Sequence, residues 1–271
     1  GDLDRLAAEG VDHVRVWAQH PNGLSDPAAI AARVRILAEE AQKRGITLTV
    51  DLFDGYSVGN RNVDNYRAMN FEALVDQVVG QSRDFDNIHW SVGNEIGDPD
   101  RPLEFARWYE EATAHIRRVG GEGTVISAQL VPGSINHPWA NPTYAEAANR
   151  IIAASDVVSV HGYPEGPVGS EPWMSGIEQR SMEWWARATK AAGKQFTVGE
   201  FGLPEHLRSK ENIEGWLRYY EDTLDVDHVS LWQFMKDDVG HVDPMSWDLI
   251  TGNHTHLDVL REGGWLGRPP H

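Results

Sequence analysis

Short apolar segments rich in β-branched and aromatic residues alternate along this chain with longer amphipathic segments, and no other feature limits the fold as strongly. Strands are expected at residues 13–17, 47–53, 87–93, 124–130, 157–163, 196–202 and 228–234. Strands separated by helical segments predict a parallel sheet with crossover helices. The sequence therefore predicts an α/β fold.

The helical segments carry start and stop signals of their own. In the segment 25–45, Asp26 is expected to cap the helix, Pro27 takes the first helical position, and Gly45 ends it. Further helices are expected at 103–120, 178–193 and 212–224. Apolar residues recur on one face of these segments, so each helix is expected to pack on the sheet.

Seven strands, most of them followed by a helix, predict a (β/α)₈ TIM barrel that lacks its first strand in this sequence. The segment 3–10, "LDRLAAEG", has the character of the helix that would follow such a strand. An open doubly wound sheet is the alternative, but that fold usually has a Gly-rich nucleotide loop after its first strand, and none occurs here. Without a linker or an internal repeat, residues 1–271 are expected to form a single barrel catalytic domain.

Charge and composition narrow the classes of partner. The chain has 24 Lys and Arg against 41 Asp and Glu, and its net charge of −17 would repel phosphate backbones and anionic membranes. No apolar run approaches the ~18 residues of a membrane span. We expect no nucleic acid partner, no membrane partner, and a monomer. The absence of cysteine leaves the compartment open, with secretion favoured.

Polar side chains stand where the expected strands end, which is where barrel enzymes place their active sites. Two of them are carboxylates that close otherwise apolar strands, Glu95 in "VGNE" and Glu200 in "VGEF". Glycosidic bond cleavage needs such a pair. One carboxyl must be protonated so that it can give its proton to the leaving oxygen, and the other must be ionised to attack the anomeric carbon or to activate water. No nucleophile elbow or P-loop supports acyl or phosphoryl transfer.

Four motifs occur in the order "VGNE" (92–95), "HGYP" (161–164), "GEFG" (199–202) and "LWQF" (231–234). Together they resemble the clan A glycoside hydrolases, most closely glycoside hydrolase family 5, over the range from about 14 to 234. The resemblance implies a retaining (β/α)₈ enzyme that needs no cofactor and acts on a β-linked carbohydrate. It makes Glu95 the acid/base and Glu200 the nucleophile.

The same resemblance implies roles for the residues around this pair. Asn94 would hydrogen-bond the sugar 2-hydroxyl. Arg15 and Tyr163 would keep the nucleophile ionised, by charge and by hydrogen bonding. His161 would contact the reacting sugar or the acid/base.

Other strand-end residues are less closely defined. The resemblance makes Trp232 the floor of the subsite at the cleavage point, and Trp17 is a further candidate for substrate binding. Asp54, with its neighbour Asp51, either contacts substrate or caps the next helix. Family 5 members commonly carry a histidine near the end of strand three, where this chain has Phe53 in the equivalent place.

The substrate is constrained only weakly. The segment 14–18, "VRVWA", is similar to the corresponding strand of β-mannanases, so a β-mannan or β-glucan is favoured. A barrel that binds saccharide without catalysis is one alternative, and a metal-dependent barrel enzyme is another. Clusters at 97–100, 241–243 and 254–256 lie away from the strand ends, and no metal is expected.

Overall fold

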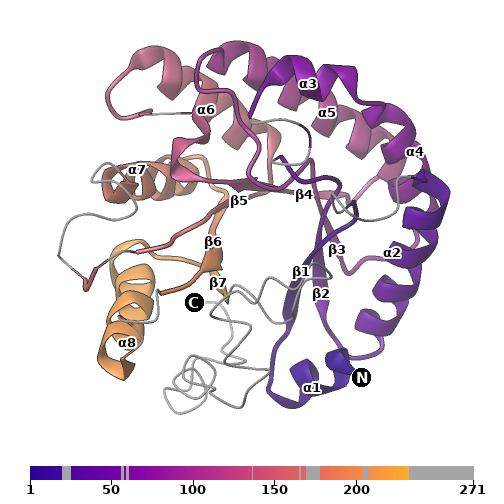
Figure 1. Cartoon of the computed structure of the whole chain (residues 1–271), viewed down its shortest axis with the longest axis horizontal. Helices are drawn as coiled ribbons and strands as arrows, with labels where there is room; N and C mark the ends of the chain where they lie inside the picture. Colours follow the sequence, from indigo (N-terminus) through magenta and orange to yellow (C-terminus); the bar gives the residue numbers. More distant parts are fainter. Residues whose placement is uncertain are drawn as a thin grey trace.

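The computed structural model describes residues 1–19, 26–55, 58, 61–135, 137–164, 166–168, 178–203, 207 and 209–231. In this part of the chain, seven parallel strands pair in chain order and alternate with helices. The strands form a nearly closed barrel, and the helices surround it as an outer layer (Figure 1). The predicted α/β barrel with seven strands is confirmed.

The strands are β1 (His13–Trp17), β2 (Thr47–Asp51), β3 (Ile88–Ser91), β4 (Val125–Leu130), β5 (Val157–Val160), β6 (Gln195–Phe201) and β7 (His228–Leu231). The helices are α1 (Asp2–Ala8), α2 (Pro27–Gln42), α3 (Val63–Ala68), α4 (Phe71–Gln81), α5 (Pro102–Gly120), α6 (Pro142–Ala154), α7 (Glu178–Ala191) and α8 (Lys210–Arg218). A 3₁₀ turn, η1 (Pro132–Ile135), follows β4, and a π-helical turn, η3 (Tyr219–Thr223), follows α8.

Helix α2 illustrates how sequence signals become structure. The Asp26 side chain accepts a hydrogen bond from the backbone N–H of Ala28 at 3.1 Å, and Pro27 stands at the first helical position, as predicted. Gly45, just past the helix, has a φ of +68°, which glycine adopts without strain. No helix in the described part of the chain is long and apolar enough to cross a membrane.

The two faces of the strands differ in polarity because side chains alternate along a strand. One set is apolar and fully buried in the core between strands and helices, as Leu48, Val50 and Ile126 are. The other set is polar and also buried, as Thr49 and Ser127 are. The interior of the barrel is therefore polar, and polar side chains continue to its carboxyl-terminal end.

Three histidine rings gather at the amino-terminal end of the barrel. The ring of His13 lies 4.9 Å from that of His228 and 5.7 Å from that of His89, between centroids. The three come from the alternate strands β1, β3 and β7, as the members of one side-chain layer of a barrel do. Burial lowers the pKa of each imidazole. We call this group the histidine layer; it links β7 to β1, the last and first strands of the described sheet.

Candidate active site

Isolated backbone bridges carry the sheet beyond the ends of β2 and β3. Asp54 pairs with Asn94, and Asn94 pairs with Gln129. The N–H of Asn94 donates to the carbonyl of Phe53 at 2.8 Å, and the N–H of Glu95 donates to the carbonyl of Gln129 at 3.0 Å. These pairings set Asp54, Asn94 and Gln129 in a row along the carboxyl-terminal rim.

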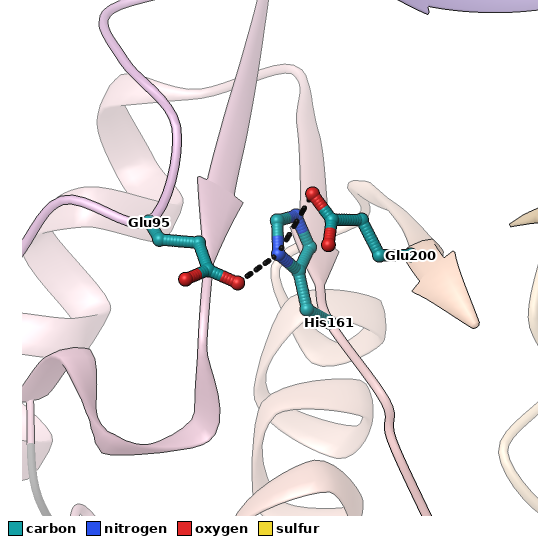
Figure 2. Close-up of side chains that lie close together, drawn as sticks. All are labelled: Glu95, His161 and Glu200. Atoms are coloured by element: carbon teal, nitrogen blue, oxygen red, sulfur yellow. Dashed lines mark hydrogen bonds and ion pairs between the residues drawn. The ribbon is translucent and has the colours of Figure 1, made fainter. Parts of the chain in front are cut away.

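The chain leaves strand geometry at Glu95. Its φ is +49°, in the left-handed region that residues other than glycine seldom occupy. Backbone strain of this kind is found preferentially at functional sites. The Glu95 side chain is buried and points toward His161 (Figure 2).

Glu200 comes from an irregular part of β6. The register between β6 and β7 shifts between Val198 and Phe201, so Glu200 sits in a bulge-like segment of the kind that redirects side chains next to active sites. A Cβ at the preceding Gly199 would lie 2.3 Å from the Ser159 hydroxyl oxygen. A larger residue at this position would therefore force the Ser159 and Gln129 side chains to move. Glu200 reaches the site from the side opposite Glu95 (Figure 2).

His161 lies between the two carboxylates. Its Nδ1 atom is 2.7 Å from Oε1 of Glu95 and 3.4 Å from Oε1 of Glu200. The three atoms all lie within 4.8 Å of one another. The structure thus brings together the two glutamates singled out from sequence, around one small gap.

Arg15 joins residues from several strands through its guanidinium group. Nη1 donates to Oε1 of Glu200 at 2.6 Å, Nε donates to Oδ2 of Asp51 at 2.6 Å, and Nη2 donates to Oδ1 of Asn94. Burial opposes the charge on Arg15, but Asp51 and Glu200 outweigh it and raise the pKa of the guanidinium. Arg15 is therefore a fixed positive charge next to Glu200.

The two aspartates that sequence left undecided have different surroundings. Asp51 is fully buried against Arg15, and burial raises the pKa of its carboxyl although Arg15 acts in the opposite direction. Asp54 accepts a hydrogen bond from Nδ2 of Asn94 at 2.9 Å. Neither caps helix α3, because the side chain of Asn62 does so. The helix-capping alternative is therefore wrong for both.

Tyr163 and Gln129 complete the polar contacts. The hydroxyl of Tyr163 donates to Oε2 of Glu200, and burial followed by the charge of Glu200 raises the pKa of the tyrosine well above its ordinary value. Oε1 of Gln129 lies 3.2 Å from Nε2 of His161, while its Nε2 donates to the Ser127 hydroxyl at 2.9 Å. Sequence had given Gln129 no role in the site. The signal available in the sequence was its place as a polar residue at the end of an expected strand.

The aromatic residues considered from the sequence differ in where the structure places them. Trp17 ends β1 at the same rim, in register with Asp51. Trp232 lies outside the described residues. Phe53 is 1% exposed, and its ring lies 5.6 Å from that of Tyr66 in the outer core. Phe53, the expected counterpart of the family 5 histidine, therefore contributes no side chain to the site, and the next residue, Asp54, accepts a hydrogen bond from Asn94.

The spacing of Glu95, His161 and Glu200 would also suit a metal ion. Two observations favour shared protons between these groups over a bound metal ion. Arg15 is bonded to Glu200 and would repel a cation, and the 2.7 Å contact between His161 and Glu95 has the length of a hydrogen bond. The arrangement thus suits proton transfer to and from two carboxyl groups.

No protein-family model matches the sequence, and a search of curated proteins finds no match. Solved structures do match. An endo-β-1,4-mannanase from Thermotoga petrophila has a TM-score of 0.68 and 14% identity, covering 98% of this chain and 72% of that one. The catalytic domain of Thermobifida fusca endoglucanase Cel5A has a TM-score of 0.67 and 17% identity, covering 96% and 84%.

A third neighbour, XacCel5A in complex with cellopentaose, has a TM-score of 0.63 and 19% identity, covering 94% of this chain and 89% of that one. These structural neighbours are family 5 endoglucanases and endomannanases. At such identities the likeness concerns the fold. The resemblance read from the motifs is confirmed at that level, over nearly the whole chain.

Proposed function

We propose that this protein is a retaining β-glycoside hydrolase that cleaves a β-linked polysaccharide or oligosaccharide. One observation carries the proposal: Glu95 and Glu200 converge on His161 with facing atoms within 4.8 Å. Retaining enzymes hold their carboxyl groups about 5–5.5 Å apart, whereas inverting enzymes leave about 6.5–9.5 Å to admit a water. Atoms this close leave little room for a water between the two carboxylates, which supports direct attack by a carboxylate.

In the first step, an oxygen of Glu200 bonds to the anomeric carbon as the glycosidic C–O bond breaks. Glu95 gives its proton to the departing oxygen. Asn94 is held by Arg15 on one side and by Asp54 on the other, so its amide is fixed for a sugar hydroxyl. This bond would strengthen as the sugar ring flattens.

In the second step, Glu95 is a carboxylate and takes a proton from water. The water oxygen bonds to the anomeric carbon, and the bond to Glu200 breaks. Two displacements at the same carbon leave its configuration unchanged. The 2.7 Å contact with His161 keeps the Glu95 carboxyl oriented through both steps.

The neighbours guide the choice of substrate. One is named an endo-β-1,4-mannanase and another an endoglucanase, which agrees with the preference for β-mannan or β-glucan drawn from "VRVWA". The net charge of −17 also suits an uncharged polysaccharide better than an acidic one.

Incubation with β-mannan, β-glucan and xylan tests the proposal. We expect new reducing ends on one of the first two, with the β-anomer appearing first by proton NMR. Glu200→Gln should abolish the signal, and Glu110→Gln, which removes a charge on helix α5, should keep it. Binding without reducing ends would support a saccharide-binding barrel instead, and loss of activity with a chelator would support a metal-dependent enzyme.

A further inference from the structure

Asp51 is a buried charge for which the two-step reaction gives no direct use. Its carboxylate bonds only to Arg15 among the described charged groups, at 2.6 Å. The Asp51 side chain is 0% exposed and that of Arg15 is 7% exposed. Leaving a carboxylate in such a place costs free energy unless its charge has a partner, so its presence calls for a reason.

The contacts of Arg15 provide a reason for the buried Asp51 carboxylate. Arg15 has two carboxylate partners, Asp51 at Nε and Glu200 at Nη1. The three groups carry one positive and two negative charges, in a region where little water screens them. The bond at Nε also fixes the plane of the guanidinium, leaving Nη1 and Nη2 directed at Glu200 and Asn94.

The balance of charge bears on the nucleophile. Arg15 alone would favour the ionised carboxylate strongly, and attack on the anomeric carbon removes that same charge. Stabilising the ground state more than the transition state slows a reaction. A second negative charge on the same guanidinium opposes this effect, because a like charge disfavours ionisation.

We propose that Asp51 is a positioning residue that orients Arg15 and offsets its charge, and so sets how readily Glu200 ionises and how well it attacks. The role rests on the proposed function of Glu200. It goes beyond that proposal in placing control of the nucleophile on a residue that does not touch it.

Other charged or titratable groups also face Glu200. They are Arg15 from β1, Glu95 after β3, and His161 and Tyr163 after β5. His161 also acts on Asp51 through its charge when protonated. Asp51→Asn removes one negative charge and keeps an oxygen that can accept from Nε of Arg15.

The experiment follows the Glu200 carboxyl directly. Protein labelled with ¹³C at the glutamate carboxyls is titrated by NMR, and the Glu200 signal is assigned by its loss in Glu200→Gln. In Asp51→Asn we expect the titration midpoint of Glu200 to fall by about one pH unit. Glu110→Gln, with the same change of charge on helix α5, should leave it in place. An unchanged or raised midpoint in Asp51→Asn overturns the proposal.

Activity gives a second readout. The leaving group of 2,4-dinitrophenyl β-cellobioside or β-mannobioside needs no proton, so the acid limb of kcat/KM reports the nucleophile. We expect Asp51→Asn to move this limb to lower pH and to reduce the plateau rate severalfold. A merely structural role would lower the amount of active protein without moving the limb, and that result overturns the proposal.

Asp51→Ser, also neutral, serves as the second variant if Asp51→Asn does not fold. The two proposals fail separately. A wild-type protein that cleaves neither glycosides nor polysaccharides contradicts the proposed function, while the NMR midpoint still decides the effect of Asp51 on Glu200.

Discussion

The carboxylate of Glu200 receives hydrogen bonds at both of its oxygens. Arg15 donates to Oε1 and the Tyr163 hydroxyl donates to Oε2. Because the pKa of Tyr163 is raised by burial and by Glu200, the hydroxyl stays protonated and remains a donor through the neutral and mildly alkaline range. Tyr163 therefore supports the ionised carboxylate of Glu200 throughout this pH range.

Tyr163→Phe removes the donor while keeping the ring. A bond to the charged form favours that form, so its loss makes Glu200 harder to ionise and should move the acid limb of kcat/KM to higher pH. We expect the plateau rate to fall about tenfold or more. The limb moves opposite to that of Asp51→Asn. Tyr109→Phe, which removes a buried hydroxyl bonded to Ser155 at 3.0 Å, is the matched control. Identical limbs in both Tyr variants would contradict the role of Tyr163.

Glu200→Ala should be inactive on its own and regain activity with azide, which fits the space left by the carboxylate. The product should be a glycosyl azide of inverted, α configuration, because only one displacement then occurs. The corresponding Glu95→Ala variant should give a β-glycosyl azide. Chromatography and proton NMR of the products check both results, and a β product from Glu200→Ala would reverse the assignments.

The sequence alone led to both glutamates, because a carboxylate that ends an apolar strand is visible in one segment. Asp51 was harder to interpret. Its partner Arg15 lies 36 positions away on a neighbouring strand, and only the register that sets Trp17 opposite Asp51 reveals the pair. Contacts that depend on strand register cannot be derived from either segment separately.

Among the elements, the turn after β3 and the turn η1 approach each other closely. A Cβ at Gly97 would lie 2.5 Å from the carbonyl oxygen of Ser134, which is backbone and cannot rotate away. Gly97 follows Glu95 by two residues. The position of Glu95 therefore depends on how these two elements pack.

Gly97→Ala should force the two elements apart. We expect the free energy of unfolding to fall by about 1–3 kcal/mol, and catalysis to fall further than stability explains. Gly133→Ala is the control within η1, since among the described residues its Cβ would meet the side chain of Arg61 at 3.6 Å, an ordinary contact. Urea unfolding and kcat measure the two effects. Equal behaviour of the two variants would show that the close approach is unimportant.

Element boundaries were predictable where the signal is local, as with Asp26 and Pro27 at the start of α2. The left-handed backbone at Glu95 and the irregular register around Glu200 were not. Both arise because neighbouring strands hold the chain in a conformation that its own sequence does not favour.

For the molecule as a whole, the alternation of strands and helices was enough to predict the barrel, since few other folds bury such a pattern. The way in which β7 approaches β1 was not predictable. In the structure the histidine layer lies across this junction, with His13 also bonded through Nε2 to the Thr49 hydroxyl at 2.8 Å. A layer of three imidazoles makes the stability of the barrel depend on pH.

The sign follows from the lowered pKa values of His13, His89 and His228. Below the unfolded pKa of about 6.5, the unfolded chain binds more protons than the folded one, so stability is full above that pH and is lost below it. Each group contributes up to about 1.4 kcal/mol per pH unit. Urea unfolding should show the free energy falling from pH 7 toward pH 5. His228→Gln should reduce this slope, and an unaltered slope would contradict the account.

In the proposed reaction, Glu200 forms a covalent bond with the sugar that Glu95 helps to release. The most direct measurement uses a 2-deoxy-2-fluoro glycosyl fluoride of the sugar identified by the polysaccharide panel, followed by mass spectrometry of the digested protein. We expect one glycosyl adduct, on the peptide containing Glu200, and none in Glu200→Gln. An adduct on another residue, or continued turnover without any adduct, would contradict it.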